Sequence, residues 1–368
     1  MTFITDEWNG KEFFKINDFH HVEFYVNNAK QAVFYYSNLF GFEVCGYKGP
    51  ETECFDSVSY LLKSGKVNFI FTSPLKSFHQ STDWLSRHGE GVFDIAFSVD
   101  SAKNALSSCL ERGAEMFSDL DEEFDNYKHA AIRTYGETIH SFIEDSNYNG
   151  YWAPGFKETK SKKQKNTHLL RIDHIVGNVE LGKMNVWQEF YSKVFGFMPF
   201  VKFDSDDIST QFSSLQSVVM RSKNWKIKLP INEPAVGINK SQIQEYLDYN
   251  EGPGVQHIAI LTDNIINSIE LLRANGVEFL DIPDTYYENL QERVGVIDED
   301  LASLKKNKIL VDRDEEGYLL QLFTKPLEDK PTLFLEIIQR KGSRGFGQGN
   351  FQSLFESIEL EQKRRGNL

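Results

Sequence analysis

The chain has 368 residues, of which 40% are hydrophobic and 14% aromatic, so it is long enough for two or three domains with substantial cores. Its formal net charge of −14 opposes contact with a phosphate backbone, which argues against nucleic acid as a partner. The sequence shows no basic segment followed by an apolar one at its start and no apolar run of about 18 residues, so we expect neither secretion nor membrane insertion.

The cysteines indicate the redox environment. There are three, Cys45, Cys54 and Cys109, an odd number without the C-x-x-C spacing of zinc or redox motifs. This usage favours reduced thiols and a cytoplasmic location.

The same series of elements occurs twice along the chain. In each place a strand-like run precedes a helical run, and a glycine suited to a helix C-terminus follows. The series is 18–26, 31–39 and Gly41 in the first place, and 172–176, 186–194 and Gly196 in the second. Both glycines stand between two phenylalanines, in Phe40-Gly41-Phe42 and Phe195-Gly196-Phe197.

A second repeat has a fixed spacing. The strand-like run 91–97 precedes the similar run 254–260 by 163 residues, and the helices that follow end at Gly113 and Gly276, again 163 apart. The chain is therefore a duplicated unit. Each half contains two modules, and in each module a strand is followed by a helix and then by further strands.

A polar segment separates the two halves. Residues 155–167 contain five lysines diluted by Glu, Thr, Ser and Gln, a composition typical of a solvated linker. We therefore predict an N-terminal domain over 1–154, a linker over 155–170 and a C-terminal domain over 171–368.

Three strand-like runs in the second half each carry one potential metal ligand, namely His174, His257 and Glu336. Two imidazoles and one carboxylate are typical of a non-haem Fe(II) site, in which they occupy one face of the metal. The spacing matches no local metal motif, and a single His or Glu on an apolar strand is more often a packed core residue. The duplication favours the metal site, because equivalent strands of two repeats come together.

The first half has aligned positions at His21, Asp94 and, more loosely, Glu144. They could form a second metal site. We favour a packing role, because a duplicated half can keep the fold without the chemistry.

The C-terminal end combines a glycine-rich run with an amphipathic helix. Residues 342–350 lack the Gly-Lys-Ser/Thr ending of a phosphate-binding loop, so we interpret them as a flexible hinge, with Asn350 as the N-cap of the helix. Apolar residues then fall on one helical face at Phe351, Leu354, Phe355 and Ile358. The helix is either an ordinary core helix or a lid over an aromatic pocket.

These features together resemble the 4-hydroxyphenylpyruvate dioxygenase family of the vicinal-oxygen-chelate superfamily. The resemblance covers nearly the whole chain and is densest from Asp173 onward. The matching strings include 229–234 (LPINEP), 251–257 (EGPGVQH) and 334–340 (FLEIIQR). It implies an α+β fold in which duplicated βαβββ modules form two open barrel-like domains, with metal only in the second.

The resemblance also implies a site. His174, His257 and Glu336 would bind Fe(2+), whose open face would take a small-molecule 2-oxo acid substrate and O2. The substrate pocket would comprise Ser217, Pro230, Asn232, Gln242, Gln256, Gln321, Phe323, Phe346, Asn350, Phe351, Leu354 and Phe355. Because Gln256 directly precedes His257, strand alternation would turn it away from the metal unless the strand bulges.

The implied reaction converts 4-hydroxyphenylpyruvate and O2 to homogentisate and CO2, a step of tyrosine and phenylalanine catabolism, in a homo-oligomer (dimer or tetramer). Two other functions stay open. One is 4-hydroxymandelate synthase, which acts on the same substrate, and the other is a metal-free ligand-binding module of the same fold.

Overall fold

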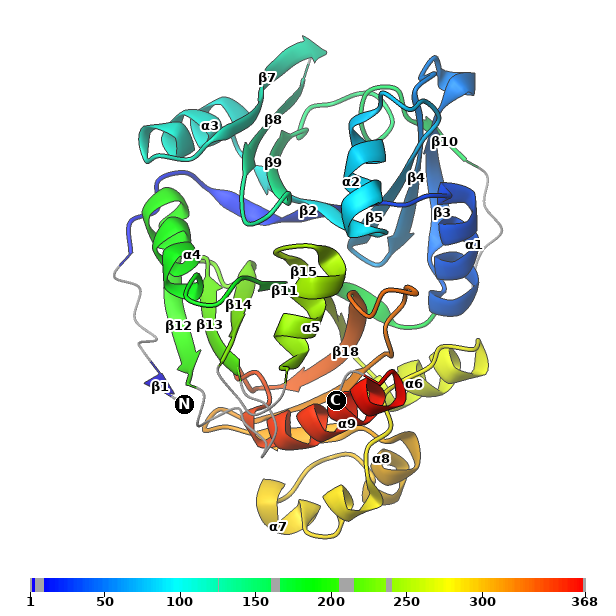
Figure 1. The fold of residues 1–368 in the computed structure, drawn as a ribbon, viewed down its shortest axis with the longest axis vertical. Coiled ribbons are helices and arrows are strands. Elements are labelled where there is room, and N and C mark those ends of the chain that lie inside the picture. Colours follow the sequence, from blue (N-terminus) through cyan, green and yellow to red (C-terminus); the bar gives the residue numbers. More distant parts are fainter. Residues whose placement is uncertain are drawn as a thin grey trace.

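The computed structural model describes residues 2–3, 10–124, 126–159, 166–204, 215–235 and 240–366. Two nine-stranded sheets curl side by side, one from each half of the chain (Figure 1). Both the N- and the C-terminus lie beside the second sheet (Figure 1).

The first sheet is built almost entirely from the N-terminal half. In sheet order its strands are β10 (Lys157–Glu158), β3 (Glu43–Lys48), β4 (Ser57–Ser64), β5 (Val67–Pro74), β2 (Ile16–Tyr25), β6 (Gly91–Val99), β9 (Ile139–Glu144), β8 (Tyr127–Arg133) and β7 (Met116–Phe124). Its central strand β2 is parallel to β5 and antiparallel to β6.

The second sheet repeats this order. Its strands are β1 (Thr2–Phe3), β12 (Met198–Phe203), β13 (Leu215–Arg221), β14 (Lys228–Pro234), β11 (Leu169–Asn178), β15 (Gly254–Thr262), β18 (Phe334–Lys341), β17 (Tyr318–Phe323) and β16 (Leu310–Arg313). The central strand β11 is parallel to β14 and antiparallel to β15, as β2 is to its neighbours. The equivalence confirms the duplication and the predicted α+β fold of βαβββ modules.

The four helices predicted from the repeat are present. They are α1 (Ala29–Phe40), α3 (Ala102–Glu111), α4 (Met184–Phe190) and α6 (Ile265–Ala274). The third differs from expectation, because its last turn, Tyr191–Phe195, widens to a π-helix. The remaining helices are α2 (Gln80–His88), α5 (Gln242–Asn250), α7 (Leu290–Val294), α8 (Leu301–Asn307) and α9 (Phe351–Arg364).

Local chemistry sets the helix ends. The side chain of Asn28 accepts a hydrogen bond from the backbone N–H of Gln31, which satisfies a free donor at the start of α1. Gly41 and Gly196 end the two equivalent helices in the left-handed conformation, at φ 76° and 72°. At Gly196 a Cβ would also lie 2.0 Å from the carbonyl oxygen of Lys11, so only glycine fits there.

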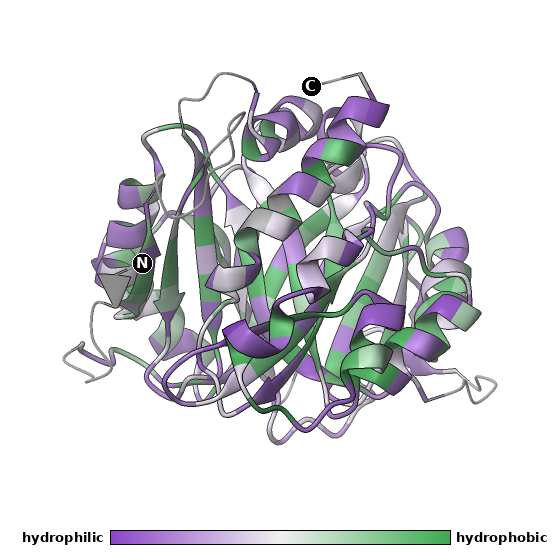
Figure 2. Ribbon diagram, turned by 90° about the horizontal axis from the view of Figure 1, so that it is seen from below, coloured by the Kyte–Doolittle hydropathy of each residue, from purple (hydrophilic) through white to green (hydrophobic). Residues whose placement is uncertain are grey.

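A continuous apolar core includes buried residues of both halves, from Phe14 to Ile337. In Figure 2 hydrophobic colour runs along the strands, while the exposed turns of the helices are largely hydrophilic. A buried polar link also joins the halves, since His140 lies between the carbonyl oxygen of Ile95 and the hydroxyl of Tyr191, at 3.0 and 2.8 Å.

Two short strands cross the predicted domain limits. Thr2–Phe3 pairs with β12 of the second sheet, and Lys157–Glu158, inside the predicted linker, pairs with β3 of the first. The division at 154 and 171 stays a prediction. Within the described residues, every helix is too short or too polar to span a bilayer.

Candidate metal centre

His174, His257 and Glu336 meet at one point inside the second sheet, with one potential ligand atom from each lying within 4.8 Å of the others. The Nε2 atoms of His174 and His257 lie 3.2 and 3.5 Å from Oε2 of Glu336. All three residues are at most 9% exposed. Among the described residues this is the group of His, Cys, Asp or Glu whose geometry could take a metal ion.

Three neighbouring strands position this trio. β11 carries His174, β15 carries His257 and β18 carries Glu336, and Ala259 of β15 pairs with both His174 and Glu336. The side chains of His174 and Glu336 therefore lie on the same face of the sheet, on either side of β15.

A β-bulge precedes each histidine. The pairing of β11 with β15 shifts by one residue between Ile172 and His174, and again between Val176 and Gly177. The extra residues are Asp173 on β11 and Gln256 on β15, each directly before its histidine. A bulge turns neighbouring side chains toward the same side, so Gln256 faces the pocket despite its position beside His257.

The bulge residues contact the ring nitrogens that face away from Glu336. Nδ1 of His174 lies 2.8 Å from Oδ1 of Asp173, and Nδ1 of His257 lies 3.1 Å from Oε1 of Gln256. Both oxygens can accept a hydrogen bond, so they favour the tautomer that has its proton on Nδ1. The lone pairs of both Nε2 atoms are then directed at the common point.

The charges of the trio are strongly perturbed. Burial disfavours the Glu336 carboxylate, but the charge of His174 and the contacts with both imidazoles outweigh burial and lower its pKa to about 2. Burial lowers the pKa of His257, whereas in His174 the charge of Glu336 and the contact with Asp173 outweigh burial and raise the pKa. The trio thus has an ionised carboxylate beside an imidazole whose pKa is raised.

A pocket opens over the trio. It includes about 610 Å³ not occupied by atoms, part of which is open to solvent. Its floor is the trio and its walls are mostly apolar. One polar atom stands out, because Oε1 of Gln321 is buried without a hydrogen-bond partner.

Most residues predicted for the substrate pocket line this cavity. They are Ser217, Pro230, Asn232, Gln242, Gln256, Gln321, Phe323, Phe346, Phe351 and Leu354. Their assignment to substrate binding stays a prediction, since the structure establishes only that they share one cavity. The side chain of Phe355 lies outside the described residues.

Asn350 differs from both of its predicted roles. It is fully buried outside the pocket lining, and its Oδ1 accepts a hydrogen bond of 2.6 Å from the hydroxyl of Tyr286. It makes no side-chain cap at the start of α9. The long-range bond to Tyr286 takes up the oxygen that a cap would have used.

The pocket also includes residues that the sequence did not single out, namely Val176, Phe203, Leu215 and Val219. Strand alternation could have placed Val176 beside His174, and Leu215 and Val219 beside Ser217. Phe203 gave no local signal, because it reaches the pocket through its pairing with Ser217 on another strand.

The glycine-rich run before α9 is an ordered turn and not the free hinge expected from its composition. Oδ2 of Asp314 accepts hydrogen bonds from the hydroxyl of Ser343 and, at 2.9 Å, from the backbone N–H of Gly345. At Gly347 the backbone is left-handed, and a Cβ would lie 2.6 Å from Oε1 of Gln321. The glycines allow this turn to pack closely against the pocket.

In the first half, the predicted alignment of Glu144 with the candidate metal ligand Glu336 was wrong. Ala96 pairs with His21, as Ala259 does with His174, and the β6–β9 register places Ser141 opposite Ala96. The counterpart of Glu336 is therefore Ser141 and not Glu144. Glu144 instead accepts a hydrogen bond from the backbone N–H of Ala102 at the start of α3.

Comparison with known proteins agrees with this architecture. Models of the glyoxalase/bleomycin resistance protein/dioxygenase superfamily match residues 171–322 and 20–130, one in each half. A mutant form of 4-hydroxymandelate synthase from Streptomyces coelicolor superimposes with a TM-score of 0.82 at 28% identity, over 95% of this chain and 100% of that one. The duplicated fold and the two family matches thus place the chain in this superfamily.

Full-length relatives narrow the class. A 4-hydroxyphenylpyruvate dioxygenase from Coccidioides posadasii is 47% identical over 373 aligned positions, covering 95% of this chain and 94% of the relative. One from Danio rerio is 46% identical, covering 100% of this chain and 96% of the relative. The chain belongs to the 4-hydroxyphenylpyruvate dioxygenase family.

Proposed function

We propose that the protein is an Fe(II)-dependent dioxygenase that converts 4-hydroxyphenylpyruvate and O2 to homogentisate and CO2, a step in the breakdown of tyrosine and phenylalanine. The observation that carries the proposal is the convergence of two imidazoles and one carboxylate on the floor of an aromatic pocket. Family membership at nearly full length supports the choice of reaction.

The donor set fits iron. Two neutral imidazole nitrogens and one carboxylate oxygen are the usual ligands of non-haem Fe(II) oxygenases, and they leave positions open for substrate and oxygen. With one carboxylate, an Fe(II) site has a net charge of about +1, which suits an anionic 2-oxo acid. The iron supplies the oxygen chemistry, and the protein supplies binding and orientation.

The pocket walls fit the aromatic end of this substrate. Phe323 stands on the sheet beside His257, with ring centroids 6.0 Å apart, and Phe351 contributes from α9. We propose that these two rings flank the substrate ring. The unpartnered Oε1 of Gln321 is an acceptor for a phenolic O–H or a bridging water, with Asn232 and Gln242 as further polar contacts.

Two further rings of the pocket pack against the imidazoles. Phe334 stacks on His257 at 4.8 Å, and Phe346 stands edge-on to His174 at 5.1 Å. These contacts help to hold the planes of the two imidazoles.

The proposal also covers the protein's location in the cell and its oligomeric state. Cys45, Cys54 and Cys109 are free thiols in the structure, which supports a reducing, cytoplasmic location. A homo-oligomer, dimer or tetramer, is proposed from the family resemblance. Light scattering coupled to size-exclusion chromatography measures that state.

A second function is favoured by one observation, the structural similarity to 4-hydroxymandelate synthase. Because that relative is 28% identical, whereas the dioxygenases are 46% and 47% identical, we place it second.

Product analysis distinguishes the two functions. The iron-loaded protein is incubated with 4-hydroxyphenylpyruvate, oxygen uptake is recorded and the mixture is separated by chromatography. We expect equal consumption of substrate and O2, with homogentisate as the main product. Hydroxymandelate as the main product would transfer the protein to the second function, and iron binding without oxygen uptake would favour a binding module.

A further inference from the structure

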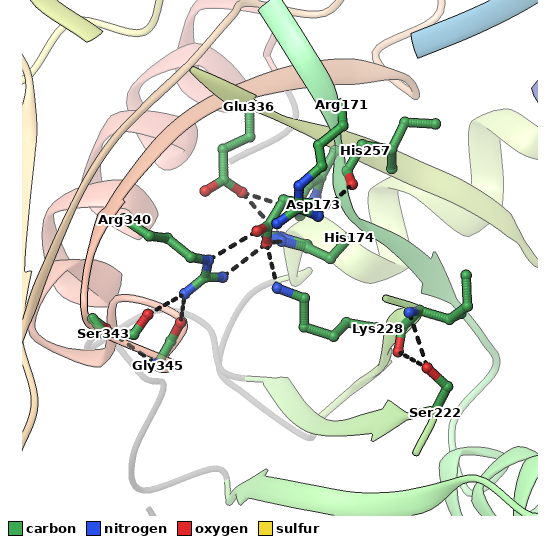
Figure 3. A network of polar contacts seen from close by, with 12 residues as sticks. Arg171, Asp173, His174, Ser222, Lys228, His257, Glu336, Arg340, Ser343 and Gly345 are labelled. Atoms are coloured by element: carbon green, nitrogen blue, oxygen red, sulfur yellow. Dashed lines mark hydrogen bonds and ion pairs between the residues drawn. The ribbon is translucent and has the colours of Figure 1, made fainter. Parts of the chain in front are cut away.

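A buried cluster of charges lies behind His174, on the side away from Glu336 (Figure 3). Its centre is Asp173, which is fully buried. Oδ1 of Asp173 accepts from Nζ of Lys228 at 2.9 Å and from Nη2 of Arg340 at 2.8 Å, and Oδ2 accepts from Nε of Arg340 at 2.9 Å. The fourth contact is the 2.8 Å hydrogen bond from Nδ1 of His174.

We propose that Asp173 is a positioning residue for the metal site, which keeps the proton of His174 on Nδ1 and thereby aims Nε2 at the metal. This inference rests on the metal role proposed above. A carboxylate that accepts the outer N–H of a ligand imidazole fixes its tautomer and ring plane and makes it a stronger donor.

The β-bulge explains how neighbouring residues can act on one ring. In a regular strand Asp173 would point to the opposite face from His174. The extra residue in β11 brings both side chains to the same side, where Asp173 meets cations from β14 and β18. The two cations stabilise a buried carboxylate that would otherwise be costly to ionise.

The two candidate ligand imidazoles are positioned unequally. His174 is bonded to a carboxylate, whereas His257 is bonded to the neutral amide of Gln256 at a longer distance, 3.1 Å against 2.8 Å. A charged acceptor forms the stronger hydrogen bond. His174 is therefore the more firmly oriented ligand and the stronger donor of the two.

The cluster also anchors the turn before α9. Nη1 of Arg340 donates to the carbonyl oxygens of Ser343 and Gly345 at 3.2 and 2.7 Å. The next residue, Phe346, stands edge-on to the His174 ring and below the Arg340 guanidinium, whose Cζ is 5.4 Å from the ring centroid. Asp173 thus fixes His174 by a direct hydrogen bond and, through Arg340, by the ring packed against it.

Charge-balanced variants test the proposal. Asp173→Asn alone would leave two buried cations with no carboxylate, so the main comparison is the unaltered chain against Asp173→Asn combined with Lys228→Met. In the unaltered cluster one anion and two cations give +1, and in the double variant Arg340 alone gives +1. Lys228→Met by itself is the control for loss of the lysine. Co(II) is the probe, and its affinity for the metal-free chain is measured by competition with a chromophoric chelator. We expect the double variant to bind Co(II) about 10- to 100-fold more weakly than the unaltered chain.

A second readout separates positioning from general support of the fold. In the Co(II) form of the unaltered chain, NMR should show two exchangeable, strongly shifted Nδ1–H signals, one from each imidazole. We expect the double variant to lose or broaden the His174 signal and to keep the His257 signal. A purely structural role would lower the melting temperature without this asymmetry.

The outcomes are distinct. Equal Co(II) affinity in the unaltered chain and the double variant would overturn the proposal. So would a fast-exchanging or absent His174 signal in the unaltered chain, a result that requires no variant to fold. Failure of the unaltered chain to bind Co(II) would instead overturn the proposed metal site, and this inference with it.

Discussion

The two halves of the chain share one strand order, yet only the second collects a set of metal-type ligands among the described residues. His21 and His174 occupy equivalent positions, but the next two positions differ. Where the second half has His257 and Glu336, the first has Asp94 and Ser141. The fold therefore brings the positions together, and the residue types decide whether they can take a metal.

The bulge residues differ in the same way. His20 of the first half stands where Asp173 stands in the second, and its Nδ1 lies 2.7 Å from Nδ1 of His21. A ring nitrogen there cannot replace a carboxylate that is ionised at neutral pH. The first half thus lacks both the complete ligand set and its charged support.

The first half uses these positions to bond its own strands together. Oδ1 of Asp94 accepts from the backbone N–H of Ser141 at 3.1 Å, and the hydroxyl of Ser141 lies 3.1 Å from Nε2 of His129. Burial raises the pKa of Asp94 to about 8, so this acid is neutral at pH 7. A neutral, hydrogen-bonded interior stabilises the fold and has no charge to offer a cation.

The largest expected effect on turnover and metal binding comes from substitutions at one pair of equivalent positions, His257 in the second half and Asp94 in the first. His257→Ala should abolish turnover and metal binding, because it removes one of the three candidate ligands. Asp94→Asn, at the equivalent position, should leave about one metal per chain and full turnover. Elemental analysis and oxygen uptake measure both. Two metals per chain in the unaltered protein, or turnover surviving His257→Ala, would contradict the assignment.

A second prediction concerns the pH dependence of stability. Asp94 has a pKa of about 8 in the folded chain and a value near 3.8 as a free side chain. Between these limits the folded state keeps a proton that the unfolded state loses, so this group's contribution is complete at low pH and disappears as the pH rises toward 8. The loss amounts to ~1.4 kcal/mol per pH unit.

Asp94→Asn removes this titration and keeps the oxygen that accepts from Ser141. Between pH 5 and pH 8 the variant should therefore lose less stability than the unaltered chain and be the more stable of the two at pH 8. Melting temperatures at four pH values give the comparison. Parallel curves for the two proteins would show that Asp94 is ionised in the folded state.

The sequence predicted the duplication because strand alternation and a 163-residue repeat are local or periodic signals. The same signals placed His174 and His257 on equivalent strands. They could not reveal the bulges, because a bulge is one residue out of period and is visible only against its partner strand. For that reason Asp173 and the orientation of Gln256 became clear only from the register of β11 with β15.

Contacts between distant segments were equally hidden. The pairing of Asp173 with Arg340 joins residues 167 positions apart, and Tyr286, which takes the side-chain oxygen of Asn350, is 64 positions away. The looser alignment of Glu144 with Glu336 was wrong for the same reason. The register places Ser141 there, and no residue type in the sequence indicated it.

The third prediction concerns α9, which has no counterpart among the described residues of the first half. Phe351 lines the pocket and packs edge-on against Phe203, with centroids 4.9 Å apart. If α9 is a lid, Phe351→Ala should weaken binding of 4-hydroxyphenylpyruvate by about 1–3 kcal/mol without oxygen present, with little change in melting temperature.

Leu360→Ala is the matched control, because Leu360 lies on the same helix and is 43% exposed. Calorimetry of the iron-loaded, oxygen-free protein measures both variants. A loss of about 3–5 kcal/mol in stability with unchanged binding would identify α9 as a core helix instead.

The smallest expected effect compares two equivalent surface contacts. Lys15 and Asp100 lie 3.1 Å apart in the first half, and His168 and Asp263 lie 3.4 Å apart at the corresponding place in the second. Exposed ion pairs contribute about 0–1 kcal/mol, so Asp100→Asn should lower the melting temperature by only about 2 °C or less. Asp263→Asn should have a smaller effect, because His168 is charged only when it is protonated.

Since salt screens exposed charges, raising the ionic strength from 0.05 to 0.5 M should remove the difference between Asp100→Asn and the unaltered chain. A larger effect of Asp263→Asn than of Asp100→Asn would show that the two halves differ at their surfaces as well as in their interiors.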